Sequence, residues 1–353
     1  MGTPLSIPAP IATAASEPHR RRLVRGWLAG EDLAPLAEAR GARFPRRLVA
    51  RLGELQLELE GLARVVAERA AGDGSRRLLF RLVDGLTVEG VLLARGALCI
   101  STQVGCAVGC GFCRTGQDGL RRQLSSAEIL AQVAAARRLR AVRRVVLMGM
   151  GEPAHNLDAV LEALAWLGSE GRIAHKDLVF STVGERRAFE RLSSSAVKPA
   201  LALSLHSTDA ALRERLLPRA PRVPPEELVE LSERYARLSG HPIQVQWTLL
   251  EGVNDSDEEL ERLAALLAGR KAIVNFIPFN PVEGTPFRRP PIERCVAMVR
   301  TLKRAGVLAT LRRSGGQDID AACGQLRVRE STSATVHHPS MQGTYTSPRP
   351  SSE

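Results

Sequence analysis

The sequence predicts an α/β fold: a partial (β/α)6 barrel with a small N-terminal helical domain and a β-hairpin extension. The main observation is a regular alternation of six apolar runs with six helical patterns. The apolar runs cover residues 97–103, 144–150, 177–183, 200–206, 243–250 and 272–279. The helical patterns lie at about 125–140, 157–168, 185–193, 226–239, 256–269 and 292–305. Such repetition indicates a parallel sheet with helical crossovers, and six units suit an open barrel better than a closed eight-stranded one.

The remaining segments are assigned by local pattern. In residues 19–72 apolar side chains step by four and three, which predicts a helical accessory domain. The clearest run is Leu48, Leu52, Leu55, Leu59, Leu62 and Val66. Residues 73–95 are expected to form a β-hairpin, because RRLLFRLV and LTVEGVLL flank a turn signal at Asp84-Gly85. The core domain then spans 96–326, and the Pro- and Ser-rich ends, 1–18 and 327–353, are expected to be disordered.

Composition narrows the function classes. The chain has 353 residues, 44% of them hydrophobic, and a formal net charge of +11. Excess positive charge is typical of proteins that bind polyanions such as nucleic acids. A genome-wide preference for arginine is the alternative, but it does not explain why cations outnumber anions. No run of about 18 uncharged apolar residues occurs, so we expect no membrane contact and a cytoplasmic protein. There, six cysteines favour metal or catalytic roles over disulfides.

Three of these cysteines form a compact motif, Cys106-x3-Cys110-x2-Cys113, after a predicted strand. Glycines between them allow the backbone to wrap around a cluster. Iron–sulfur clusters normally take four thiolates, so three cysteines leave one iron open to a substrate. S-adenosylmethionine (SAM) can chelate that iron through its amino and carboxylate groups. The alternative is a zinc site with Cys99 or Cys323 as fourth ligand, which the absence of a second C-x2-C pair disfavours.

The cysteine motif is part of one of five segments that together resemble a known protein family. These are LCISTQVGCAVGCGFC at 98–113, MGMGEP at 148–153, SLHS at 204–207, FIPFNP at 276–281 and DIDAACGQL at 318–326. Over roughly 76–326 the sequence resembles the RlmN/Cfr family of radical SAM RNA adenine methyltransferases. The resemblance implies a radical SAM barrel that carries a [4Fe–4S] cluster on Cys106, Cys110 and Cys113.

The same resemblance implies which residues contact SAM. They are Gly151, Glu152, Ser181, Ser204, Leu205, His206 and Asn280. All of them lie at or just after the ends of predicted strands, where barrels of this kind place their chemistry. The alternatives are an ordinary strand-ending turn at Gly151–Glu152 and a buried structural histidine at His206.

Two further cysteines and one glutamate have roles that the resemblance implies. Cys323 would first be methylated by one SAM and would then carry the one-carbon unit to the adenine. Cys99 would attack the sulfur of Cys323, forming a disulfide and releasing the methylated base. Glu89 would accept the proton from the adenine carbon. The alternatives are a buried strand cysteine for Cys99 and a solvated strand glutamate for Glu89, while Cys295 is interpreted as a core residue.

The expected function is methylation of carbon 2 of an adenosine in 23S rRNA, with tRNA as a further target. The alternatives are methylation of carbon 8, as in Cfr, and a catalytically inactive, metal-bound RNA-binding homologue. The expected partners are RNA and an electron donor such as flavodoxin or ferredoxin, and the protein is expected to be a monomer.

Overall fold

The computed structural model describes residues 11, 16–38, 43–312 and 314–327. Most of the two ends that the sequence predicts to be disordered therefore lies outside the described residues. The first helix, α2 (Glu17–Ala29), begins within the segment 1–18. None of the helices in the described ranges is long and apolar enough to span a membrane.

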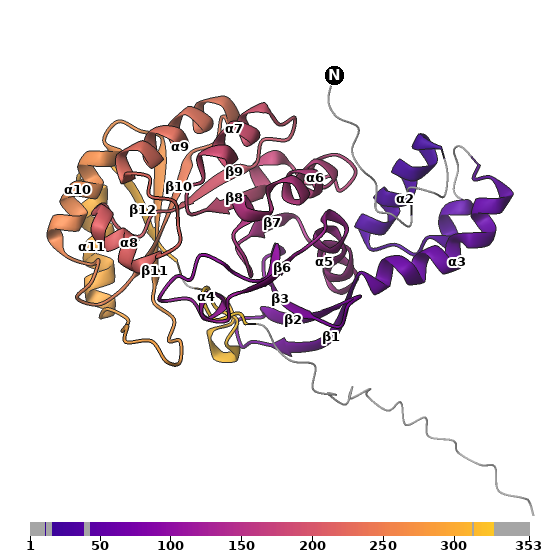
Figure 1. Ribbon diagram of the computed structural model, residues 1–353, viewed down its shortest axis with the longest axis horizontal. Coiled ribbons are helices and arrows are strands. Elements are labelled where there is room, and N and C mark those ends of the chain that lie inside the picture. Colours follow the sequence, from indigo (N-terminus) through magenta and orange to yellow (C-terminus); the bar gives the residue numbers. More distant parts are fainter. Residues whose placement is uncertain (1–10, 12–15, 39–42, 313, 328–353) are drawn as a thin grey trace, which may run out of the picture.

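A parallel sheet forms the centre of the molecule, so the α/β fold expected from the sequence is confirmed (Figure 1). Its parallel strands, in spatial order, are β4 (Ala97–Cys99), β7 (Arg144–Leu147), β8 (Leu178–Thr182), β9 (Ala200–Ser204), β10 (Ile243–Leu249), β11 (Ala272–Pro278) and β12 (Leu308–Leu311). Every neighbouring pair among them is parallel. The first six fall in the six apolar runs of the sequence, and β12 is an addition at the edge.

Helices connect the parallel strands. The long ones are α5 (Ser126–Leu139), α6 (Leu157–Gly168), α7 (Arg186–Ser194), α9 (Pro225–Ser239), α10 (Asp257–Leu267) and α11 (Ile292–Arg304). Shorter turns are α8 (Ala210–Leu216), η2 (Pro153–Asn156), η3 (His175–Asp177) and η4 (Gln317–Ile319). Ser125 caps α5 in a capping box with Glu128, which fixes where that helix begins. The core lies between strands and helices, and its largest fully buried side chains include Trp166, Phe180, Trp247 and Phe276.

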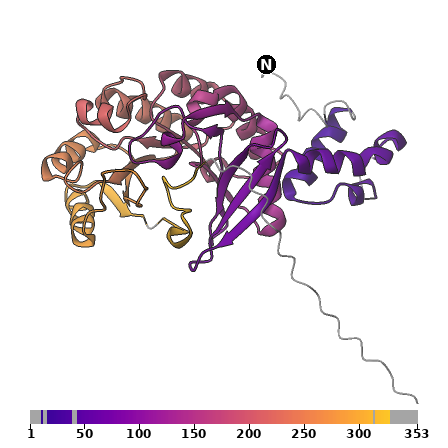
Figure 2. The ribbon, with the colours of Figure 1, turned by 60° about the horizontal axis from the view of Figure 1, so that its bottom comes forward.

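Three antiparallel strands extend the sheet beyond β4. They are β1 (Ala63–Ala70), β2 (Arg76–Leu82) and β3 (Thr87–Leu92), here called the β1–β3 ribbon. The strands β2 and β3 meet around Gly85, whose φ of 84° suits the tight turn. In Figure 2 the ribbon runs between the helical part and the barrel. The helical pattern expected as far as Val66 is wrong after Gly61, because residues from Ala63 onward pair with β2 instead.

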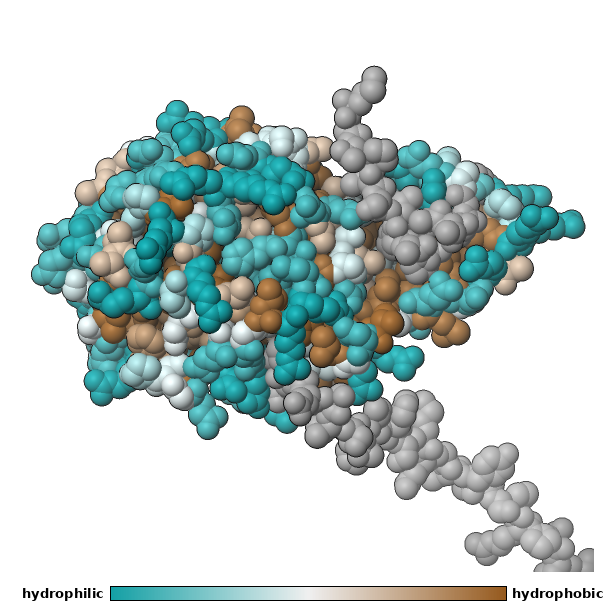
Figure 3. Space-filling view, in the orientation of Figure 1, coloured by the Kyte–Doolittle hydropathy of each residue, from teal (hydrophilic) through white to brown (hydrophobic). Residues whose placement is uncertain are grey.

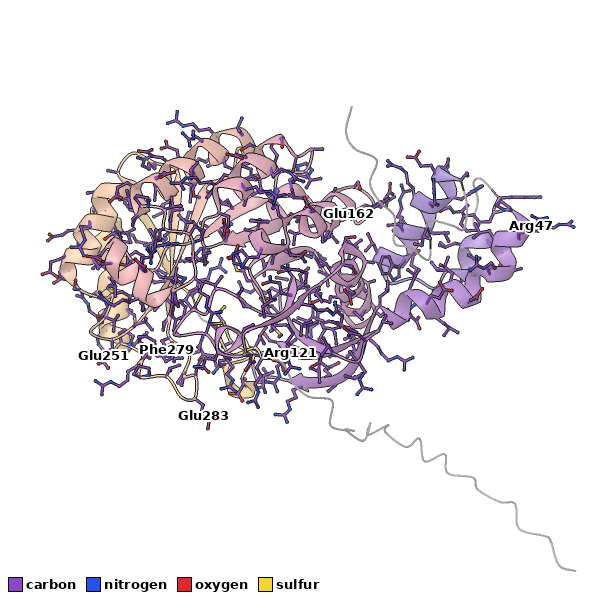
Figure 4. The ribbon with its side chains drawn as sticks, viewed as in Figure 1. Arg47, Arg121, Glu162, Glu251, Phe279 and Glu283 are labelled. Atoms are coloured by element: carbon purple, nitrogen blue, oxygen red, sulfur yellow. The ribbon has the colours of Figure 1, made fainter. Side chains whose placement is uncertain are left out.

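The N-terminal helices form a separate lobe beside the barrel (Figure 1). Besides α2 this lobe contains η1 (Ala34–Ala37) and α3 (Arg46–Gly61). The leucines of α3 at positions 48, 52, 55 and 59 are buried, as their spacing predicts. Arg47 lies at the end of α3 that is farthest from the barrel (Figure 4). Hydrophilic side chains dominate the face in Figure 3, with small hydrophobic patches between them.

Candidate functional site

A small antiparallel pair of strands holds the three-cysteine loop. The chain enters the loop through β5 (Gln103–Gly105) and leaves it through α4 (Arg114–Gln117) and β6 (Leu120–Gln123), which pairs with β5. Gly105 has φ of 83°, and a Cβ atom there would lie 1.8 Å from the carbonyl oxygen of Gly119. Only glycine fits this position, because both the backbone conformation and the contact exclude a side chain.

A cavity opens at the carboxyl ends of the parallel strands, beside this loop. Nine of the thirteen residues named from the sequence line it: Cys106, Cys110, Cys113, Gly151, Glu152, Ser181, Ser204, His206 and Cys323. Residues that sequence reasoning did not name also line it, among them Met148, Val183, Gln246, Thr248 and Phe279. In the view of Figure 4, the labels of Phe279, Arg121 of β6 and Glu283 lie on the lower side of the barrel.

The donor set in this cavity fits an iron–sulfur cluster. Burial raises the pKa of the Cys110 thiol well above its usual value, and negative charge on Cys113 and Cys106 raises it further. A nearby cation favours ionisation of three thiols so arranged, and a cluster supplies such a charge. Each thiolate of a cluster binds a different iron, so the sulfurs stand farther apart than around one ion. In the described ranges no three His, Cys, Asp or Glu side chains are arranged to hold a single metal ion.

Glu152 presents a buried carboxylate to the cavity. It follows Gly151, whose φ of 104° and close contact with Gln103 leave no room for a Cβ atom. The carboxylate accepts hydrogen bonds from the backbone N–H groups of Ala154 and Val183, both at 3.1 Å. Burial nevertheless raises the pKa of Glu152. A cationic group in the cavity, such as the amino group of SAM, would therefore be stabilised by this carboxylate.

His206 is neutral in this structure. Burial, with a smaller contribution from Arg213, lowers its pKa to about 3. Its Nδ1 atom accepts a hydrogen bond of 2.9 Å from the backbone N–H of Thr248, which leaves Nε2 as the proton-bearing nitrogen. The ring packs edge-on against Phe112 of the cysteine loop, with ring centroids 4.9 Å apart. His206 therefore supports the loop and offers the cavity a neutral side chain.

Gln246 is a cavity residue that sequence reasoning missed. Its side chain lies on β10, it is 4% exposed, and its Nε2 atom has no hydrogen-bond partner among the described residues. An unpaired buried amide facing a cavity fits a ligand with a hydrogen-bond acceptor. A signal was present in the sequence, because Gln244, Gln246 and Thr248 alternate with apolar residues in a strand expected to be buried on both faces.

The structure places Cys323 close to Cys99 and to Cys113 of the cluster loop, but only Cys323 and Cys113 line the cavity, and Cys99 does not. Cys99 ends β4, and Cys323 lies in the turn after η4 and lines the cavity. Burial raises the pKa of Cys99, and negative charge on Cys323 raises it further. The same charge contributes to the raised pKa of Cys113, so Cys323 lies near both sulfurs. Cys295 is fully buried on α11, as a core residue.

Three of the residues named from the sequence are engaged elsewhere. Leu205 is fully buried and donates its backbone N–H to Gln246. Asn280 donates from Nδ2 to Ser314 Oγ and to the backbone oxygen of Cys323, both at 3.1 Å. Glu89 is buried on β3 and forms an ion pair with Arg77. None of the three lines the cavity, so their roles as SAM contacts and proton acceptor stay predictions.

Comparison with known proteins agrees with this geometry. Residues 100–264 match the model of the radical SAM superfamily. A probable RNA methyltransferase of Aromatoleum aromaticum is 59% identical over 331 residues, covering 93% of this chain and 92% of that protein. One from Thiobacillus denitrificans is 60% identical over 318 residues, 90% of this chain and 88% of that protein. The crystal structure of a radical SAM methyltransferase from Sphaerobacter thermophilus aligns with a TM-score of 0.77 and 36% identity, over 88% of this chain and 92% of that one. The chain therefore belongs to the radical SAM superfamily, in the same methyltransferase family as these relatives.

Proposed function

We propose that this protein methylates carbon 2 of an adenosine in 23S rRNA, with tRNA as a further substrate, through a methyl group carried on Cys323. The observation that supports this most is the position of Cys323, which lines the same cavity as the three-cysteine loop and lies close to Cys99 at the end of β4. An adenine ring carbon is a poor nucleophile, so direct displacement on SAM does not methylate it. When bound, a [4Fe–4S] cluster supplies the electron for radical chemistry with SAM.

The residues of the chain have distinct tasks in this proposal. Cys106, Cys110 and Cys113 hold the cluster, and Glu152 orients the amino group of SAM. The Cys323 thiolate takes a methyl group from one SAM, so a sulfur–carbon bond forms as the sulfonium bond breaks. Joining that carbon to the adenine would remove a hydrogen atom from the methyl group, taken up by radical chemistry on a second SAM, and a proton and an electron from the adenine ring, with the oxidised cluster as the electron acceptor. Cys99 then attacks the sulfur of Cys323. A disulfide forms, and the electron pair of the broken carbon–sulfur bond leaves with the methylated base, which takes up a proton.

The partners follow from the same chemistry. Each turnover requires electrons from outside the chain, for which a flavodoxin or a ferredoxin is the proposed donor. The disulfide between Cys99 and Cys323 has to be reduced before the next cycle. We place the protein in the cytoplasm, where thiols are kept reduced, and we propose that it acts as a monomer.

Nucleoside mass spectrometry tests the proposal directly. The protein is purified without oxygen, its cluster is reconstituted, and it is incubated with SAM, a reductant and ribosomal RNA or tRNA. We expect 2-methyladenosine with the wild type and none with Cys323→Ala. Cys99→Ala should instead accumulate a covalent RNA–protein adduct, because the resolving thiol is missing. Formation of 8-methyladenosine would support the carbon 8 alternative, and the absence of SAM cleavage would support an inactive homologue.

A further inference from the structure

The segment that carries Cys323 is fastened to the β1–β3 ribbon on both sides of that cysteine. Arg77 of β2 donates from Nη1 to the backbone oxygen of Asp320, at 3.1 Å. Glu89 of β3 accepts the backbone N–H of Arg327 at Oε2, at 3.0 Å. These attachments lie three residues before and four residues after Cys323. We call residues 320–327 the Cys323 loop.

The two anchoring side chains form one buried unit. The Nε atom of Arg77 lies 3.7 Å from Oε1 of Glu89, and the two side chains are 5% and 1% exposed. The register of β2 and β3 pairs Leu79 with Glu89 and Arg77 with Val91, so the charged pair lies diagonally across the two strands. Glu89 therefore uses one carboxylate oxygen for Arg77 and the other for the loop.

Further contacts attach the chain just before the Cys323 loop to the same ribbon. In the turn between β1 and β2, the backbone N–H of Gly72 donates a hydrogen bond to the Asp318 carboxylate, at 2.9 Å. The Asp73 carboxylate of the same turn accepts a hydrogen bond from the backbone N–H of Gly316, at 3.1 Å. On its other side, the loop accepts the N–H of Arg114, next to Cys113, at the oxygen of Gly324, at 2.7 Å. The loop thus bridges the ribbon and the cluster loop, and Figure 2 shows the yellow C-terminal segment beside the purple strands.

We propose that Glu89 and Arg77 are positioning residues that hold the Cys323 loop on the β1–β3 ribbon, in the place where its thiol meets the cavity. This replaces the proton-acceptor role for Glu89, whose carboxylate is bound to Arg77 and Arg327 and does not line the cavity. The consequence of positioning for catalysis rests on the proposed function, since it assumes that Cys323 carries the methyl group. The structural consequence, that these two residues keep the Cys323 loop ordered, does not depend on the proposed function.

Hydrogen exchange of the purified protein tests the structural part without cluster, SAM or RNA. In Glu89→Ala and Arg77→Met, amides of residues 320–327 should exchange about tenfold faster than in the wild type, because the local opening free energy falls. Glu89→Gln should stay close to the wild type, since its amide oxygen can still accept the N–H of Arg327. The matched control is Glu68→Ala on the same ribbon, which breaks an exposed pair with Arg76 at 2.9 Å and should leave the loop unchanged.

The catalytic part is tested on the reconstituted enzyme by following the methylation of Cys323 from SAM without RNA, by peptide mass spectrometry. No adenine proton is transferred in this half-reaction, so a proton acceptor has no task in it. We expect methylation of Cys323 to slow at least about tenfold in Glu89→Ala and to recover in Glu89→Gln, which should also release methylated RNA. The fold-change corresponds to about 1.4 kcal/mol.

The opposite pattern would overturn the inference. If Glu89→Ala and Glu89→Gln both methylate Cys323 at the wild-type rate, exchange normally in the loop and stall with RNA attached, Glu89 is the proton acceptor. If Glu89→Ala does not fold, Glu89→Gln decides alone, because only positioning predicts that it releases product. A wild-type protein that never methylates Cys323 would refute the proposed function and leave the exchange result standing.

Discussion

The polar side chains of the cavity differ in whether they already have hydrogen-bond partners within the protein. Glu152 and His206 have backbone partners, whereas the Nε2 atom of Gln246 has none among the described residues. Leaving a buried amide unpaired costs about 1–3 kcal/mol, which a bound ligand can recover. Replacing Gln246 is therefore expected to lower the affinity for a ligand without lowering the stability of the fold.

Gln246→Leu is expected to weaken SAM binding by about five- to tenfold, since one hydrogen bond is worth about 1 kcal/mol. The free energy of unfolding should not fall, because leucine replaces an N–H group that has no partner in the described structure. Anaerobic titration calorimetry and urea denaturation measure the two quantities. Gln244→Leu, on the same strand but outside the cavity lining, is the control. Equal SAM affinity in the wild type and both variants would show that Gln246 does not contact the ligand.

At the scale of elements, the clearest prediction about stability concerns Gly105, in the turn that leads into the cysteine loop. Gly105→Ala should destabilise the fold by about 3 kcal/mol or more, because it adds a backbone clash to an unfavourable left-handed conformation. Gly85→Ala is the matched control, with φ of 84° and no atom within 4 Å of the added Cβ, and should cost only about 1 kcal/mol. Urea denaturation gives both values, and absorbance of the reconstituted cluster reports the loop. Equal losses in the two variants would contradict the clash at Gly119.

Elements with long periodic patterns could be predicted from the sequence, whereas those created by tertiary pairing could not. The six strands and six helices of the barrel each bury a regular apolar face, and their positions followed from that regularity. The strands β5 and β6 are short and pair across the cysteine loop, so they have no local periodicity from which they could be predicted. Val66 continued the leucine spacing of α3, but pairing with β2 made it part of a strand. Local pattern and strand pairing competed there, and pairing prevailed.

The candidate site shows the same division. Strand ends place Gly151, Ser181 and Ser204 at one cavity, as a parallel barrel requires. For Asn280 and Glu89 the resemblance gave roles that their contacts in this chain do not display, because both side chains bind the segment around Cys323. That segment is held by partners far away in sequence. Its attachment could be recognised only once the β1–β3 ribbon and the barrel were in place.

At the scale of the whole molecule, the net charge of +11 makes a prediction that the fold alone does not. If the positive charge serves RNA, the affinity for ribosomal RNA should fall about a hundredfold between about 50 and 200 mM salt, as expected when about five phosphates are neutralised. The affinity for SAM should change little over the same range, because SAM is small and binds inside the cavity. Fluorescence anisotropy of a labelled RNA fragment and titration calorimetry of SAM measure the two responses. An RNA affinity as insensitive to salt as that of SAM would mean that the excess of arginine reflects composition and that other contacts recognise the RNA.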